Sequence, residues 1–256
     1  MGAHVVELDE LVTFTNDFLE VDRFRDYCPN GLQVEGRARI GHLVSGVTAS
    51  QALLERAHEA GADAVLVHHG YFWKGEAAPV VGIKQRRLKL LLTHDISLLA
   101  YHLPLDAHPK LGNNACLGLE LGLSVEGQFG DAGGVAIGLH GALDTPMKAG
   151  AFADHLARVL GRRPLHVPGE GAMVRTVAWC SGAAQGYIEA AADLGVDAFV
   201  TGEASEQTFH LARERGIHFY AAGHHATERY GVAALGAFLA EQFGIRHTFI
   251  DVENPI

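Results

Sequence analysis

The first hundred residues show short apolar runs separated by helical patterns, an arrangement typical of strands joined by helices. Apolar positions at helical spacing and an acidic first turn predict a helix over residues 7–19. Apolar runs bounded by turn residues predict buried strands over 43–48 and 64–70, with a helix over 51–62 between them. A strand, a helix and a strand in this order predict parallel strands joined by a right-handed crossover.

A second copy of this pattern follows later in the chain. Residues 49–69 align with residues 183–203 at a constant offset of 134, without a gap. The identical positions are Ala49, Gln51, Glu55, Ala57, Gly61, Asp63 and Ala64, which match Ala183, Gln185, Glu189, Ala191, Gly195, Asp197 and Ala198. We interpret the match as a duplicated α/β unit, although any two units of this kind share strand, helix and glycine positions.

The expected fold is therefore α/β, with two similar, duplicated units, mainly parallel sheets and helices packed outside. We place the first unit at residues 1–126 and the second at 127–256, in a single compact chain whose halves interlock. The Gly-rich, unpatterned segment 126–150 suits a connector. Ligands collect beyond the carboxyl ends of parallel strands, so we expect a site at those ends, between the halves.

Composition narrows the function classes. The chain is 48% hydrophobic and 20% charged, which is globular, and its net charge of -10 argues against a dedicated nucleic-acid binder. The densest basic run, 84–89, is more typical of a solvated helix face. Three widely spaced cysteines, with neither a signal peptide nor a long apolar span, favour a cytoplasmic protein away from membranes. Sixteen histidines are unusual, and clustered histidines indicate metal binding or acid–base chemistry.

Four polar clusters come directly after apolar strands, so they are expected at one edge of the sheet. They are His68-His69, His102 with Asp106 and His108, Thr201-Gly202-Glu203, and His224-His225 with Glu228. Adjacent residues of a strand point to opposite faces, so His68 and His69 would each bind a separate ion more readily than share one. The alternative is a structural pair that donates hydrogen bonds to backbone carbonyls.

Two carboxylates and a further histidine extend this set. His224 and Glu228 are four residues apart, which places them on one face of a helix start. Asp106, in the loop expected after a strand at 98–102, adds a carboxylate, and a carboxylate can bridge two ions through its two oxygens. Histidine and glutamate at this spacing also occur on solvated helix faces, so the pair is weak evidence by itself.

The candidate ligands of two divalent metal ions are His68, His69, Asp106, His224 and Glu228. Their nitrogen and oxygen atoms suit Fe, Mn, Zn, Co or Ni alike. Two neighbouring ions polarise an electrophile and hold a hydroxide made from water, which is the arrangement of a hydrolase. His102 and Glu203 are then candidates for general acid–base catalysis or for hydrogen bonding to a metal ligand, and each also has a structural interpretation.

Several longer segments resemble one protein family. They are PNGLQVEG, GVTAS, GADAVLVHHGYFWKG, YHLPLDAHPKLGNN, VDAFVTGE and HFYAAGHHATERYG, and the match runs over nearly the whole chain. The sequence is similar to the Nif-three-like dinuclear metal-centre family, also called GTP cyclohydrolase 1 type 2 homologues. The resemblance implies that the family's paired histidine ligands fall on His68 and His69 and its aspartate on Asp106. It also implies that the helix-start ligands fall on His224 and Glu228, with the glutamate touching both ions.

The resemblance further implies a ring-shaped homohexamer and an activity that opens the imidazole ring of GTP. We therefore expect a metal-dependent hydrolase that acts on C–N bonds of a nucleotide or a similar polar small molecule. The sequence shows no Gly-rich phosphate cradle. The alternative is a non-catalytic, metal-dependent assembly or interaction protein. An open coordination position would favour the enzyme, because structural metal sites are closed.

Overall fold

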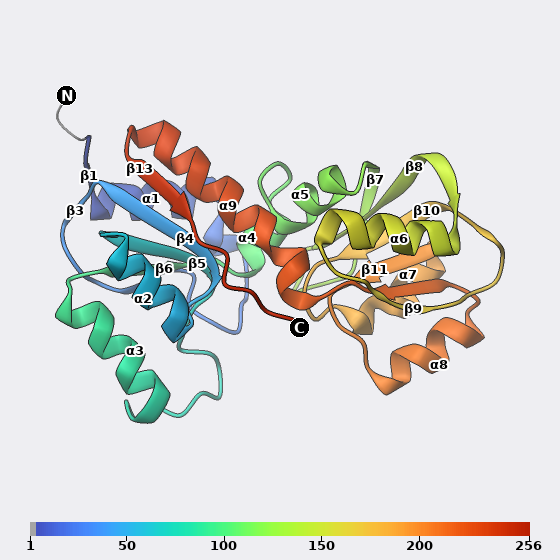
Figure 1. The fold of residues 1–256 in the computed structure, drawn as a ribbon, viewed down its shortest axis with the longest axis horizontal. Coiled ribbons are helices and arrows are strands. Elements are labelled where there is room, and N and C mark those ends of the chain that lie inside the picture. Colours follow the sequence, from blue (N-terminus) through green and yellow to red (C-terminus); the bar gives the residue numbers. More distant parts are fainter. Residues whose placement is uncertain (1–3) are drawn as a thin grey trace. The chain divides into compact units, whose positions relative to one another are not determined.

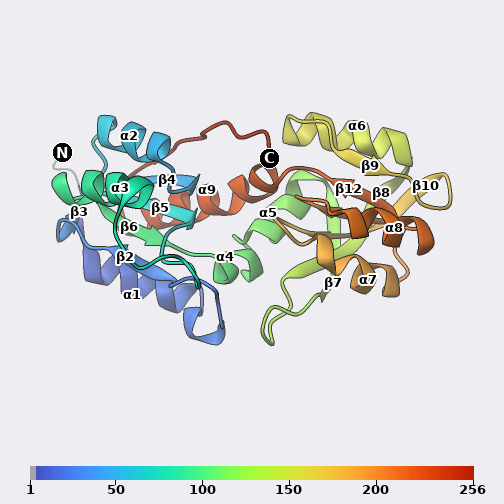
Figure 2. The same ribbon diagram turned by 90° about the horizontal axis from the view of Figure 1, so that it is seen from below.

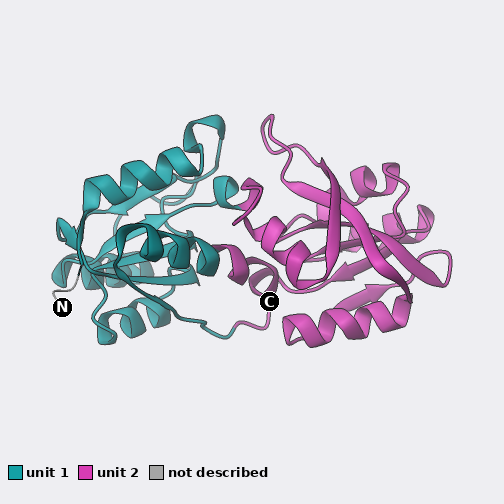
Figure 3. Ribbon diagram, turned by 90° about the horizontal axis from the view of Figure 1, so that it is seen from above, with its two compact units in different colours: residues 1–105, 232–253 teal, residues 106–231, 254–256 magenta. Residues whose placement is uncertain are grey.

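The computed structural model describes residues 4–256, and the chain divides into two compact units (Figure 3). Unit 1 comprises residues 1–105 and 232–253, and unit 2 comprises residues 106–231 and 254–256. Each unit is an α/β body with its own large sheet, as the sequence predicts. We describe each unit by itself.

Unit 1 contains a five-stranded sheet with the order β13-β4-β5-β6-β2. Strands β13, β4, β5 and β6 are parallel neighbours, and β2 pairs antiparallel with β6 at the edge. The strands are β2 (Gly31–Val34), β4 (His42–Thr48), β5 (Ala64–His69), β6 (Ser97–Ala100) and β13 (Arg246–Phe249). A separate antiparallel pair joins β1 (Val6–Glu7) to β3 (Arg39–Ile40).

Helices lie over both faces of this sheet (Figures 1 and 2). Alternating apolar side chains of the central strands pack against them on the two sides. Leu66 of β5 packs in one core with Leu11 of α1 and Leu235 of α9. Its neighbour Val65 packs in the opposite core with Leu54 of α2. The helical elements of unit 1 are α1 (Leu8–Phe18), η1 (Val21–Arg23), α2 (Gln51–Glu59), α3 (Gly82–Thr93) and the later part of α9 (His224–Phe243).

Unit 2 contains a six-stranded sheet with the order β7-β8-β10-β11-β12-β9. Strands β10, β11 and β12 are parallel neighbours, and the three outer pairings are antiparallel. The strands are β7 (Leu123–Phe129), β8 (Gly138–Lys148), β9 (Leu165–Val167), β10 (Met173–Cys180), β11 (Ala198–Thr201) and β12 (His218–Ala221). The parallel strands form the centre of the sheet, where the sequence predicts a parallel core.

Helices cover both faces of this second sheet (Figure 2). On one face, Trp179 of β10 and Val200 of β11 pack with Leu117 of α5 and Phe152 of α6. Helices α7 and α8 lie over the other face, where Phe199 of β11 is fully buried. The helical elements are α5 (Asn113–Glu120), α6 (Ala149–Leu160), η2 (Gln185–Tyr187), α7 (Ile188–Asp193), α8 (Glu206–Glu214), and the start of α9.

The Gly-rich segment 126–150 is not the connector that its composition suggested. Most of it belongs to β7 and β8, which form an antiparallel hairpin at one side of the sheet. Glycine is what permits this pairing, because a Cβ at Gly141 would lie only 1.7 Å from the carbonyl oxygen of Ser124. Glycines and exposed polar side chains weaken the alternation that identifies a strand in sequence.

The division into units also differs from the sequence-based boundary between residues 126 and 127. Residues 106–126 belong to unit 2, because Leu117 of α5 packs in the core of that unit. The chain returns to unit 1 within α9, between Gly231 and Val232. Within residues 4–256, no helix combines the length and the apolarity that a membrane span requires.

Candidate metal centre

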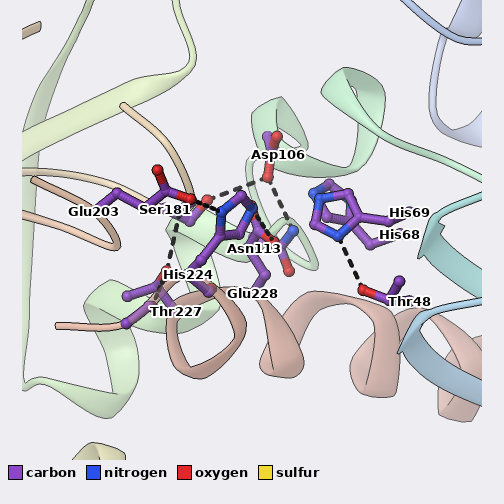
Figure 4. Close-up of polar contacts among 12 residues, drawn as sticks. Thr48, His68, His69, Asp106, Asn113, Ser181, Glu203, His224, Thr227 and Glu228 are labelled. Carbon is purple, nitrogen blue, oxygen red and sulfur yellow. Dashed lines mark hydrogen bonds and ion pairs between the residues drawn. The ribbon is translucent and has the colours of Figure 1, made fainter. Parts of the chain in front are cut away.

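Two histidines stand at the end of β5 in unit 1. The preceding residues of the strand are apolar and fully buried, which makes β5 a central strand and brings its polar end to the sheet edge. His68 is buried, and its Nδ1 lies 2.9 Å from the carbonyl oxygen of Tyr101. His69 is half-buried, and its Nδ1 lies 3.2 Å from the hydroxyl of Thr48 in the neighbouring strand β4 (Figure 4). The two ring centroids are 4.5 Å apart.

His102 follows β6 and joins this pair in unit 1. Its ring centroid lies 5.1 Å from that of His68 and 5.8 Å from that of His69. One ligand atom from each of the three histidines falls within 4.8 Å of the others, so the group can hold a metal ion. Nδ1 of His102 lies 2.8 Å from the carboxylate of Asp26. Burial alone would raise the pKa of Asp26, but hydrogen bonds from His102 and its neighbours hold that pKa down at about 2.

In unit 2, the first turn of α9 carries a histidine–glutamate pair, as the spacing predicts. Nε2 of His224 lies 3.1 Å from Oε2 of Glu228, whose side chain is only 4% exposed. On its other side, Nδ1 of His224 lies 2.6 Å from the carboxylate of Glu203 (Figure 4). Burial lowers the pKa of His224, but Glu228 and Glu203 outweigh it and raise the pKa to about 9. One carboxylate therefore faces each ring nitrogen of this imidazole, an arrangement that favours a positive charge there.

Asp106 lies in the short helix α4 (Leu103–Ala107), not in the loop expected from the sequence. Its side chain is buried, and Oδ1 accepts hydrogen bonds from Asn113 at 2.9 Å and from Ser181 at 3.2 Å (Figure 4). After burial, the negative charges of Asp106 and Glu228 are the next causes that raise the pKa of the Cys180 thiol. Both carboxylates are therefore near the same buried residue of unit 2.

The imidazoles of His68, His69, His102 and His224 share one pattern. Each directs Nδ1 at an oxygen atom, whether a backbone carbonyl, a hydroxyl or a carboxylate. Metal-binding histidines are typically held in this way, because an oxygen partner at one nitrogen fixes the ring and leaves Nε2 as the ligand atom. The imidazole nitrogens and carboxylate oxygens of the set fit a divalent transition metal.

A cavity of about 440 Å³ in unit 1 and one of about 330 Å³ in unit 2 open at the surface of their units. The unit 2 cavity reaches Asp106 and is walled largely by apolar side chains, among them Ile137 and Leu139. Glu126 and Gln128 of β7 supply polar groups. A small organic molecule in this cavity would touch a candidate metal ligand, whereas the unit 1 cavity is lined by residues 13–23 and contains none of them.

The sequence missed the partners that hold the ligands. Thr48, Asn113 and Ser181 each bind a candidate ligand, and Asp26 binds the candidate catalytic residue His102; none of the four stands in a histidine cluster. Part of the signal was present, since Asp26 directly precedes the turn motif at 27–36. His94 of unit 1 takes no part in this group; it stacks on His58, with the ring centroids 3.8 Å apart. Of the two candidate catalytic residues, His102 joins the pair at the end of β5, and Glu203 binds His224.

Known proteins resemble this chain over its whole length. The family model described as Duf34/NIF3 (NGG1p interacting factor 3) matches residues 6–255. A Pseudomonas aeruginosa protein named GTP cyclohydrolase 1 type 2 homolog is 59% identical over 250 residues, covering 98% of this chain and 99% of that protein. A Yersinia pestis protein of the same name is 56% identical over 247 residues, covering 96% and 98%.

Solved structures agree with the sequence matches. The structure titled protein ybgI, of unknown function, has a TM-score of 0.94 and 50% identity, covering 98% of this chain and 100% of that chain. The crystal structure of TTHA1606 from Thermus thermophilus has a TM-score of 0.88 and 37% identity, with the same coverage. The resemblance inferred from the sequence motifs is thereby confirmed for fold and family.

Proposed function

The chain belongs to the Duf34/NIF3 family, and on this premise we propose that it holds two divalent metal ions. The proposed ligands are His68, His69, Asp106, His224 and Glu228. The observation that carries the proposal is the shared setting of the imidazoles, each of which has an oxygen atom at Nδ1. An oxygen atom at Nδ1 is the usual setting of a metal-binding histidine, because it fixes the ring and leaves Nε2 as the ligand atom.

The bound ions would make the protein a hydrolase. Two neighbouring divalent ions polarise an electrophile and activate water at neutral pH. The chain's own contribution is to hold the imidazoles in one tautomer and to supply two carboxylates whose charge offsets that of the ions. Glu203 serves this purpose by orienting His224, and it remains a candidate for proton transfer.

The proposed substrate is a nucleotide or a similar polar small molecule with a C–N bond to be hydrolysed. Relatives from several bacteria are named GTP cyclohydrolase 1 type 2 homolog, which motivates this choice. The cavity beside Asp106 supports an organic ligand. None of the described residues that line it is Lys or Arg, so the heterocycle of a nucleotide suits it better than the phosphates do.

Metal titration of Glu228→Gln tests the dinuclear site. A bridging carboxylate binds both ions and reduces their mutual repulsion, so this substitution should lower occupancy at both sites together. His69→Ala should empty mainly one site. Glu241→Gln is a matched control, because Glu241 is an exposed glutamate of the same helix, α9. Unchanged stoichiometry and affinity in Glu228→Gln would remove the bridging role.

Turnover tests the enzymatic activity separately. Metal-loaded protein should hydrolyse at least one member of a panel of nucleotides and cyclic amides, and Asp106→Ala should abolish that turnover. A protein that binds two ions per chain but turns over no member of the panel would favour the alternative, a metal-dependent assembly or interaction protein.

We further propose, from the family resemblance alone, that the protein is cytoplasmic and assembles with itself into a ring-shaped hexamer. Light scattering after size-exclusion chromatography should give six times the mass of the 27.4 kDa chain. A monomer at micromolar concentration would contradict the assembly.

A further inference from the structure

The carboxylate of Asp26 is buried in unit 1 and accepts four hydrogen bonds. Its side chain is only 3% exposed. It accepts hydrogen bonds from the backbone N–H of Tyr27 at 2.7 Å and of Leu103 at 3.0 Å, and from the side-chain amide of Asn30 at 2.9 Å. Its fourth partner is Nδ1 of His102, at 2.8 Å. Four donors occupy this carboxylate, so it can turn toward no other group.

The same short segment also fixes the backbone of His102. The backbone N–H of His102 donates to Oδ1 of Asn30 at 2.7 Å, and Trp73 lies edge-on to the imidazole at a centroid distance of 5.0 Å. Position and ring plane are both determined. Because Asp26 cannot donate, the proton of the neutral imidazole is on Nδ1, and Nε2 carries the lone pair.

The surroundings of Nε2 of His102 suit a metal ligand. Throughout residues 4–256, no hydrogen bond to Nε2 of His102 is present, and the side chain is 13% exposed. Ring nitrogens of His68, His69 and His102 approach one another within 4.8 Å, so His102 is close enough to join a metal ion held by either of the other two.

We propose that His102 is a further imidazole ligand of the metal centre, the third from unit 1 beside His68 and His69, and that Asp26 is the positioning residue that fixes its tautomer. The inference rests on the proposed metal-binding function and adds a sixth ligand to it. It also gives a function to the turn segment 26–30, which holds a metal ligand in place. A carboxylate behind a histidine ligand raises the basicity of the imidazole and its affinity for metal.

Calorimetric titration of the full chain with Zn²⁺ and with Co²⁺ tests the ligand. With either metal, His102→Ala should weaken binding at one of the two sites at least ten-fold and leave the affinity of the other site nearly unchanged. Asp26→Asn should weaken the same ion by about 10–100-fold, because an amide cannot accept four hydrogen bonds. The Co²⁺ absorption spectrum, which reports ligand number and geometry, should change in both variants.

Two matched controls separate this role from general effects. His58→Ala removes an exposed imidazole of unit 1 that stacks on His94, so metal affinity should not change. Asp63→Asn removes a carboxylate that accepts backbone hydrogen bonds from Gly41 and His42 in the same unit. It should lower stability and leave metal affinity as it is.

One further measurement does not depend on variants that fold. Nitrogen-15 NMR of the metal-free wild-type protein should show His102 protonated on Nδ1 and unprotonated on Nε2. The opposite tautomer would overturn the proposal, as would wild-type affinity for both ions together with an unchanged Co²⁺ spectrum in His102→Ala. Failure of the proposed function would look different, because the wild-type protein itself would then bind fewer than two ions.

Discussion

In each unit an aspartate directly precedes a central strand, β5 in unit 1 and β11 in unit 2, but the two strands end in different residues. At the offset of 134 residues, Asp63 of unit 1 corresponds to Asp197 of unit 2. Asp63 accepts a hydrogen bond from the backbone N–H of His42 at 2.9 Å, and Asp197 accepts one from Thr176, the matching residue, also at 2.9 Å. The backbone frame is thus alike in both units.

At the end of the next strand the similarity stops. His68 and His69 of unit 1 correspond to Gly202 and Glu203 of unit 2. Unit 1 therefore presents two imidazoles at a strand end. Unit 2 presents a carboxylate there, which holds the imidazole of His224 from the start of α9.

Close backbone contacts explain why glycine stands at position 202. A Cβ at Gly202 would lie 2.6 Å from the carbonyl oxygen of Gly182 and 2.7 Å from the Cα of His224. The start of α9 therefore occupies the space that a side chain like that of His68 would need. The comparison shows that one frame can offer a ligand from a strand or from a helix, and that the choice depends on what packs against the strand end.

The largest effect is expected from Gly202→Ala. The contacts that its Cβ would make are with backbone atoms, which cannot move aside as a flexible side chain can, so we expect a loss of about 2–3 kcal/mol in unfolding free energy. Urea unfolding of the metal-free protein measures it. Gly186→Ala is the control, because its Cβ would enter open space, and it should change stability by less than about 0.5 kcal/mol. Equal effects in the two variants would break the comparison.

The hydrogen-bond partners of the histidines should contribute unequally to metal affinity in the two units. Glu203→Gln removes the charge behind His224 and should weaken metal binding by about 10–100-fold. Thr48→Val removes a neutral hydroxyl 3.2 Å from His69 and should cost less than ten-fold. Calorimetric titration of both variants under one condition decides the order. A larger loss of affinity in Thr48→Val than in Glu203→Gln would contradict the greater contribution expected of the charged partner.

Metal uptake should depend on pH through His224. With its pKa raised to about 9, this imidazole is protonated at neutral pH in the metal-free protein, and it must lose the proton to bind metal. Affinity should therefore rise by up to about ten-fold per pH unit between pH 6.5 and 9 and level off above it. Titrations in buffers of different ionisation enthalpy would also detect the released proton. A flat profile would exclude His224 as a ligand.

The smallest effect is expected at the cysteines, all of which are free. Burial and, secondarily, Asp26 raise the pKa of Cys28 to about 12, and burial raises that of Cys180 well above its usual value. Both thiols should therefore resist iodoacetamide in the folded protein at pH 8. Cys28→Ala and Cys180→Ala should leave metal stoichiometry unchanged. Loss of metal in a folded variant would add a thiolate to the site.

Features that depend on local backbone geometry could be predicted from the order of residues. Four apolar residues ahead of His68 and His69 predict a buried strand that ends in two histidines, because a central strand needs apolar side chains on both faces. The spacing of His224 and Glu228 places them together on a helix, because residues four apart share a face. Such relations are set within a few residues of the chain.

The partners of each histidine and the ends of each unit follow from long-range packing. Asp26 is 76 residues from His102 along the chain, and Glu203 is 21 residues from His224. Contacts of this length depend on how strands and loops pack, and no local pattern reports them. The boundary within α9 has the same origin, because Leu235 belongs to unit 1 through its packing with distant residues such as Leu11 and Leu66.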